Sequence, residues 1–144
     1  MSVEENKALV LRFYDEVFNK RNLALADEMI APEYKNHSAP PGTPPGPEGI
    51  KRVVNMLAGV SPDCVHTIED IFGEGDKIVW RGTLSGTHLG SFMGNPPTGK
   101  TFVQKQMHII RLAGGKQVEH WAMRDELGLQ QQLGFSFAPP PARV

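Results

Sequence analysis

The order of two apolar patterns along the chain predicts an α+β fold. In the first 60 residues apolar side chains recur at helical spacing, whereas from Cys64 onward they alternate with polar ones as strands do. Helices that come first and a run of consecutive strands that comes second are typical of α+β proteins. We expect a single domain, residues 1–134, in which N-terminal helices pack on a curved antiparallel sheet and enclose a cone.

Two helices are expected before Pro32. Ser2 and Glu5 have the spacing of a capping box, in which each side chain satisfies a free backbone N–H of the other residue. Asn22 is expected to cap a second, shorter helix, which ends before Pro32 because a residue preceding proline avoids the helical conformation. Tyr34–His37 is predicted to be extended. The first helix presents one apolar face, which consists of Val10, Phe13, Tyr14, Val17 and Phe18.

A proline-rich loop leads to a third helix. Ala39–Pro47 holds five prolines in nine residues, which excludes a helix interior or a central strand. Pro47 suits the first turn of a helix, and Gly59 suits its end. We expect this helix to pack against the sheet through Ile50, Val53, Val54 and Leu57.

Four strands are expected to form one antiparallel sheet. Glycine turns join the first two strands and the last two, and the glycine- and proline-rich segment Gly86–Lys100 joins the middle two. Leu127–Leu133 is predicted to be a short amphipathic helix, and residues 135–144 a loosely ordered proline-rich tail. The predicted strands are Cys64–Phe72, Lys77–Thr87, Thr101–Leu112 and Lys116–Arg124.

Composition excludes several classes of partner. The formal net charge of −1 gives no general reason to bind nucleic acid or an anionic membrane. Cys64 is the only cysteine, so no intrachain disulfide forms, and we expect a cytoplasmic protein. No spacing of metal ligands and no phosphate-binding loop is present, so neither a metal nor another cofactor is predicted. Apolar residues on both faces of the strands, such as Val79 and Trp80, predict a homodimer formed through the sheet.

Four blocks of sequence resemble the SnoaL-like polyketide cyclase family, which has the cone fold of nuclear-transport-factor-like proteins. The blocks are Phe13–Asn19, Glu33–His37, Gly86–Lys100 and Gly115–Gly134. The resemblance implies ring closure on a polyketide ester by intramolecular aldol condensation, without metal or nucleotide. It also implies that an aspartate near the end of the last strand is the general acid and base, and Asp125 matches that aspartate.

Asp125 is therefore the first candidate for catalysis. Aldol closure needs a base that removes a proton next to a carbonyl and an acid that protonates the new alkoxide, and one carboxyl of raised pKa can do both in turn. Burial beside Trp121 would raise that pKa, whereas Arg124 would lower it. The alternative is that Asp125 caps the following helix, a position where aspartate is favoured.

Histidines supply the other polar candidates. His108 lies in the middle of a predicted strand and, if it faces the cone, can polarise a carbonyl or hold an enolate oxygen; the alternative is a hydrogen-bonded core histidine. His37 is expected at the rim, where it would contact substrate or be a simple loop residue. His66 is placed in a strand with unknown facing, and His88 in the glycine-rich segment.

The facing of the last strand decides which side chains enter the cone. A regular strand puts Trp121 and Asp125 on one face, and His120 and Arg124 on the other. We expect the face with Trp121 and Asp125 to line the cone, although a bulge would change part of this alternation. Phe13, Tyr14, Val17 and Trp80, with Phe92 and Met93, form either an apolar lining of the cone or part of the core, since aromatics at this spacing are more often core. Contacts to substrate are also expected from His37, His120, Trp121 and Arg124.

The predicted function is thus cofactor-independent closure of a ring on an apolar small molecule. Three alternatives stay open at this point. The chain can be a non-catalytic carrier of a hydrophobic small molecule, an isomerase or hydrolase on the same scaffold, or an assembly module whose cone is filled by side chains.

Overall fold

A five-stranded sheet organises the chain, and the computed structural model describes residues 1–135 of it. The strand order is β1-β5-β4-β3-β2, and each pair of neighbours is antiparallel except β1 and β5, which are parallel. The predicted α+β class and the antiparallel pairing of the four long strands are confirmed. The strands are β1 Ile30–Asn36, β2 Val65–Glu74, β3 Lys77–Thr87, β4 Thr101–Ala113 and β5 Lys116–Arg124.

Strand β1 begins earlier than predicted, and the prediction that the second helix runs on toward Pro32 is wrong. Helix α2, Ala24–Met29, ends where the buried Ile30 pairs with Gln117 of β5. Pro32 is tolerated because β1 is an edge strand, where a missing N–H need not interrupt the sheet. Asn22 does not cap this helix, since Leu23 holds the N-cap position without a side-chain hydrogen bond.

The first helix contains a wider turn. The predicted capping box of Ser2 and Glu5 is present at the start of α1, Val3–Phe13, and the chain continues as a π-helical segment, Tyr14–Asn19. Tyr14 and Val17 within this segment are both buried. Single π-helical turns often occur at functional sites.

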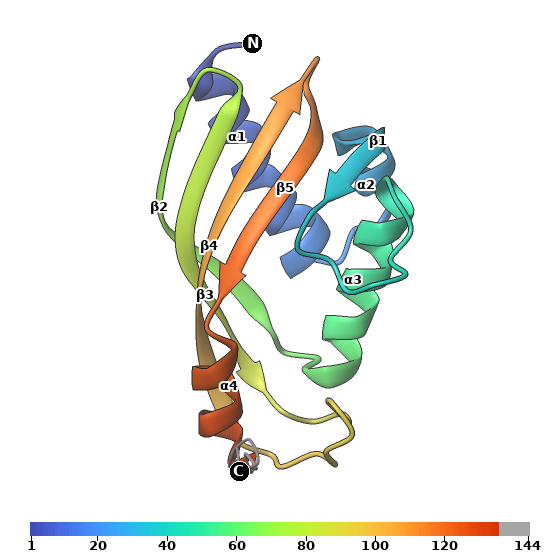
Figure 1. Cartoon of the computed structure of the whole chain (residues 1–144), viewed down its shortest axis with the longest axis vertical. Coiled ribbons are helices and arrows are strands. Elements are labelled where there is room, and N and C mark those ends of the chain that lie inside the picture. Colours follow the sequence, from blue (N-terminus) through green and yellow to red (C-terminus); the bar gives the residue numbers. More distant parts are fainter. Residues whose placement is uncertain (136–144) are drawn as a thin grey trace, which may run out of the picture.

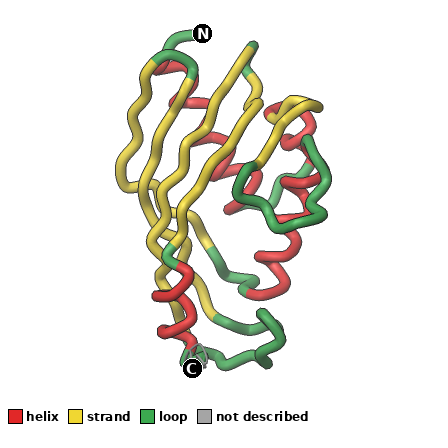
Figure 2. The backbone as a smooth tube through the Cα atoms, viewed as in Figure 1, coloured by secondary structure: helices red, strands yellow, loops and turns green. Residues whose placement is uncertain are grey.

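Helices lie on one side of the curved sheet (Figures 1 and 2). Helix α3, Pro47–Val60, packs on α2 and on β1, the edge strand of the sheet, so the predicted packing of this helix against the sheet is confirmed. The last helix, α4, Glu126–Leu133, packs against β4 at the other end. As a result, the centre of the concave face is left between two groups of helices.

Two apolar clusters stabilise these groups. The larger cluster joins α1, the π-helical segment and α3 to β3 and β4, and includes Phe13, Val17 and Trp80. The smaller one joins α4 to β3 and β4 through Leu84, Phe102 and neighbouring residues. The predicted tail falls, apart from Phe135, outside the described residues, so its order and the domain boundary at residue 134 stay predictions.

Candidate active site

A cavity of about 290 Å³ lies on the concave face of the sheet, between the two apolar clusters. Apolar side chains of α3 and aromatic side chains of the first helix cover one side of it, and residues of α4 reach its mouth. Most of the polar lining comes from the sheet, namely Tyr34, Asn36, His66, Gln104, Gln106, His108, His120 and Arg124. Tyr14, Ser38, Ser61 and Glu126, the first residue of α4, complete it.

The expectation that Trp121 and Asp125 face the cone is wrong. His120 and Arg124 line the cavity, whereas Trp121 points to the other face and stacks on His37, with ring centroids 4.9 Å apart. The alternation itself was predicted, but not which face is inside. His120 is the inward residue because it finds a polar partner, Asn36, on the concave face.

Asp125 has left the strand and begins the last helix. Its Oδ1 accepts a hydrogen bond from the Gly128 N–H at 2.9 Å, which makes it the N-cap of α4, and the side chain is exposed. This is the capping role that the sequence left open as an alternative. The acid and base role predicted for Asp125 thus lacks the cavity position on which it depended.

Two histidines meet inside the cavity. His108 Nδ1 lies 2.7 Å from His120 Nε2, and both side chains are buried. At one end of this pair, His120 Nδ1 lies 3.0 Å from Asn36 Oδ1. At the other end, His108 Nε2 lies 2.8 Å from Gln106 Oε1. The pair is therefore bounded on each side by an amide oxygen.

Neighbouring hydrogen bonds fix the orientation of both amides. The Ser38 N–H donates to Asn36 Oδ1 at 2.9 Å, so this oxygen can only accept from His120. Gln106 Nε2 donates to Gln104 Oε1 at 2.8 Å, which directs the Gln106 oxygen toward His108. Three contacts between these oxygens thus need three hydrogens, whereas two neutral imidazoles carry only two. One further proton would satisfy the whole chain of contacts.

Aromatic rings hold His108 in place. The indole of Trp80 stacks on the His108 ring, with centroids 4.1 Å apart and planes 9° from parallel. The Tyr14 hydroxyl lies 3.4 Å from His108 Nδ1. Trp80 and Val17, both predicted to contact substrate, are fully buried core residues and do not line the cavity, while Phe13 and Tyr14 do.

Burial keeps this pair neutral near pH 7. Desolvation lowers the pKa of His120 to about 3, with smaller contributions from the charges of Arg124, His37 and His66. Desolvation, followed by the charge of His120, lowers the pKa of His108 still further. Burial also raises the pKa of the Tyr14 hydroxyl, which stays protonated.

His66 is a third histidine of the cavity. Its backbone N–H and C=O both bond to the Asn19 side chain, at 2.8 and 3.0 Å, so the end of the first helix positions this part of β2. Within residues 1–135 its ring makes no side-chain hydrogen bond, and burial lowers its pKa to about 3. The ring packs edge-on against Tyr14 and Phe18.

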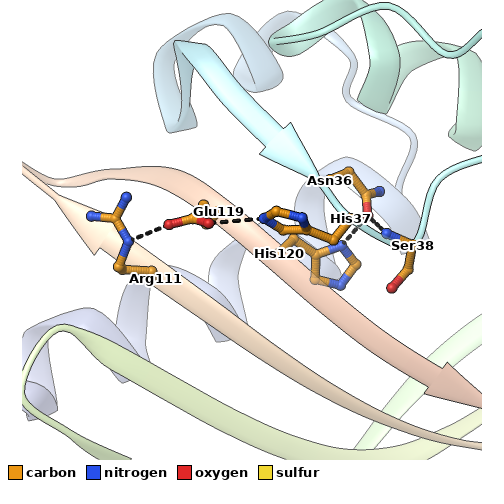
Figure 3. A network of polar contacts seen from close by, with 6 residues as sticks. All are labelled: Asn36, His37, Ser38, Arg111, Glu119 and His120. Atoms are coloured by element: carbon orange, nitrogen blue, oxygen red, sulfur yellow. Dashed lines mark hydrogen bonds and ion pairs between the residues drawn. The ribbon is translucent and has the colours of Figure 1, made fainter.

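A second polar network lies across the same strands, outside the cavity (Figure 3). Arg111 Nε donates to Glu119 Oε1 at 2.7 Å, and His37 Nε2 lies 2.8 Å from Glu119 Oε2. Hydrogen bonds from His37 and from Arg111 lower the pKa of Glu119. His37, predicted at the rim in contact with substrate, instead belongs to this outer network and does not line the cavity.

Sequence reasoning named His108, His120, Phe13, Tyr14 and Arg124 but did not assign several other polar residues to the cavity. Gln104 and Gln106 carried a usable signal, because with His108 they form three polar residues on one face of a strand. Asn36 and His66 carried none, since their facing depends on pairing that the sequence does not reveal. The polar lining residues that it did not assign are Tyr34, Asn36, Ser38, Ser61, His66, Gln104, Gln106 and Glu126.

Residues 1–135 also show whether a metal site or a membrane-spanning helix is present. Within that range no three His, Cys, Asp or Glu side chains come together as a metal site. No described helix is both long and apolar enough to span a membrane.

The chain is similar to known polyketide cyclases in sequence and in fold. A sequence model of the family described as SnoaL-like polyketide cyclase matches residues 8–133. Aklanonic acid methyl ester cyclase DauD of Streptomyces sp. (strain C5) is 32% identical over 139 residues, covering 89% of this chain and 86% of that protein. Nogalonic acid methyl ester cyclase of Streptomyces nogalater is 29% identical over 119 residues, covering 81% and 89% respectively. The solved structure of TsrD from Streptomyces laurentii superposes with a TM-score of 0.84 at 30% identity, covering 93% of this chain and 98% of that one.

Proposed function

The chain belongs to the SnoaL-like polyketide cyclase family, and from this premise we propose that it closes a ring on a polyketide-derived small molecule without a cofactor. The reaction we infer is an intramolecular aldol addition in the cavity on the concave face of the sheet. The apolar side chains around the cavity suit the carbon skeleton of such a substrate.

The proton-transfer group in this proposal is the His108–His120 pair rather than Asp125. The pair removes a proton from the carbon next to a carbonyl, which leaves an enolate. The enolate carbon then attacks a second carbonyl of the same molecule, so one C–H bond breaks and one C–C bond forms. The proton held by the pair returns to the new alkoxide oxygen, and no net proton is gained or lost.

The observation that carries this proposal is that the neutral histidine pair has one hydrogen too few for the three contacts between Asn36 Oδ1 and Gln106 Oε1. A neutral pair leaves one contact unsatisfied, whereas a pair that has accepted a proton satisfies all three. The arrangement therefore stabilises the protonated form that desolvation opposes, and suits a group that holds a proton only briefly.

Tyr14 completes the site. Its hydroxyl stays protonated because burial raises its pKa, and it lies beside the base at 3.4 Å from His108 Nδ1. A protonated phenol at this point can donate to the oxygen on which charge develops. Base and oxyanion donor would then act on neighbouring atoms of one substrate.

The test uses aklanonic acid methyl ester as the probe and chromatography with mass detection of the cyclised product. His108→Gln and His120→Gln are expected to lower turnover by roughly 10²–10⁴-fold, the usual contribution of a positioned proton-transfer group. His37→Gln is the matched control, because that histidine lies on the outer face. Melting temperatures identify variants that have lost the fold.

Unchanged turnover in both cavity variants would overturn the assignment of the base. Binding of the probe without any ring closure by the unaltered chain would favour the carrier function. His66→Gln completes the set, since a loss confined to that variant would move the base to β2.

We further propose that the chain forms a homodimer through the outer face of the sheet and acts in the cytoplasm. Alternate residues of β4 on this face are exposed and largely apolar, among them Val103, Met107 and Ile109, and Met123 of β5 lies beside them. A contiguous apolar area of this kind is commonly covered by a partner. Sedimentation equilibrium at micromolar concentration checks this, and a monomer would contradict it.

A further inference from the structure

We propose that the substrate carries a free carboxylate and that the guanidinium of Arg124 binds it inside the cavity, an inference that rests on the ring-closing function proposed above. The named relatives are cyclases of methyl esters, in which the corresponding acid is masked. A substrate with an unmasked acid would distinguish this chain from them.

The position of Arg124 is the first step of the argument. It is the last residue of β5 and lies on the same strand face as His120, so both side chains line the cavity. Within residues 1–135 its side chain makes no hydrogen bond and no ion pair. By contrast, Arg81 and Arg111, on neighbouring strands, each pair with carboxylates.

The direction of its charge is the second step. Arg124 also borders a shallow hollow on the opposite face of the sheet. Its positive charge nevertheless acts on groups within the cavity, because it lowers the pKa of His66, His108 and His120, which lie on three different strands. The geometric support is that Arg124 lines the cavity together with His120, which lies on the same face of β5.

No other side chain of the described cavity lining supplies a negative charge within ion-pair distance of the Arg124 guanidinium. Apart from Glu126, the polar groups of the cavity are amides, two phenols, two serine hydroxyls and neutral histidines, none of which can neutralise a full positive charge. Glu126 at the mouth is the one carboxylate of the lining; it is exposed and does not lie within 4 Å of a guanidinium nitrogen of Arg124. A ligand carboxylate matches the planar fork of an arginine through two parallel hydrogen bonds.

Binding of a carboxylate would also prepare the base. The charge of Arg124 is one of the causes that lower the pKa of both paired histidines. A bound anion offsets that charge and so makes the His108–His120 pair a stronger base when substrate is present. Recognition of the acid and removal of the proton would thus be coupled through one side chain.

The experiment compares aklanonic acid with its methyl ester in calorimetric binding titrations. We expect the unaltered chain to bind the acid more tightly than the ester. Arg124→Gln should weaken binding of the acid by about 10- to 100-fold and leave binding of the ester within about twofold, since only the acid loses a charged bidentate contact. Arg124→Lys should retain part of the difference. Arg81→Gln, on the outer face, is the matched control, and Glu126→Gln tests the rival carboxylate at the mouth.

Binding and turnover separate the two proposals. Ester bound as tightly as acid, equal weakening of both by Arg124→Gln, or no Arg124-dependent binding of the acid would each overturn the carboxylate site. Arg124-dependent binding of the acid without ring closure would support the carboxylate site and overturn the proposed function instead.

Discussion

The two faces of strands β4 and β5 carry polar networks of opposite character. On the inner face, His120 meets His108 and two amides, with no carboxylate among its hydrogen-bond partners. On the outer face, His37 meets Glu119, which is also paired with Arg111. The same type of side chain is therefore kept neutral by burial on one face and given an anionic partner near water on the other. Within the described part of the chain, no carboxylate bonds to the inner pair, so a proton can be added there without changing a contact with a carboxylate.

The two networks are joined by consecutive residues. Asn36 points inward to His120, while His37 points outward to Glu119, and the Ser38 N–H fixes the Asn36 oxygen (Figure 3). The contact between His37 and Glu119 thus holds the segment that orients the inner histidine. We infer that the outer network positions Asn36 and that the inner network transfers the proton.

The largest expected effect is a loss of folding stability at acid pH, because the histidines of the inner face are buried in the neutral form. His66 and His120 have pKa values of about 3 when folded and 6.5 as the reference value for the unfolded chain. The unfolded state therefore binds more protons, so stability is complete above about pH 6.5 and falls as the pH drops toward 3. At pH 5 the two together should remove roughly 4 kcal/mol, at about 1.4 kcal/mol per pH unit each.

Denaturant unfolding between pH 7.5 and 5 measures this loss. His66→Gln should reduce the slope of stability against pH by about one proton. Equal slopes in the unaltered chain and His66→Gln would contradict the burial of a neutral imidazole on β2.

Asn36→Asp should make the inner face resemble the outer one. A carboxylate 3.0 Å from His120 Nδ1, where the amide oxygen now lies, would favour the imidazolium and raise the pKa of His120 by roughly 1–3 units. The base would then be protonated over more of the pH range, so the rate profile should shift to higher pH. Histidine titration by NMR reads the pKa directly, and an unmoved titration would show that Asn36 does not face the ring in solution.

Glu119→Gln should make the outer face resemble the inner one, with a smaller effect. The ion pairs that it removes are partly exposed, and such pairs contribute little to stability. We expect turnover to fall by less than about fivefold, through looser positioning of Asn36, and the salt dependence of the melting temperature to weaken. A loss as large as that of His120→Gln would mean that the outer network takes part in proton transfer.

The comparison also explains what the sequence could predict. The alternation of apolar and polar residues predicted the bounds of β3 and β5 correctly, because a strand with one buried face has apolar side chains at every second position. It did not predict which face of β5 lines the cavity, because His120 and Trp121 are both amphipathic and either fits a half-buried position. The role of Asn36 depends on the parallel pairing of β1 with β5, between segments more than 80 residues apart, and no local pattern encodes that pairing.

Asp125→Asn should have the smallest effect and is the sharpest test of the sequence-based assignment. Asparagine keeps a side-chain oxygen that can accept from the Gly128 N–H, and Asp and Asn are nearly equal at the N-cap, so stability should change by only a few tenths of a kcal/mol. Turnover should stay within about twofold, because Asp125 lies outside the cavity and proton transfer is assigned to the histidine pair. Asp125→Ala should lose about 1 kcal/mol through the missing cap, again with little change in turnover per folded molecule. Together the two variants distinguish the capping role of Asp125 from a role of its carboxyl group in proton transfer. A fall of 10²-fold or more in Asp125→Asn at unchanged melting temperature would restore the carboxylate as the acid and base, and would require α4 to turn that side chain into the cone when substrate binds.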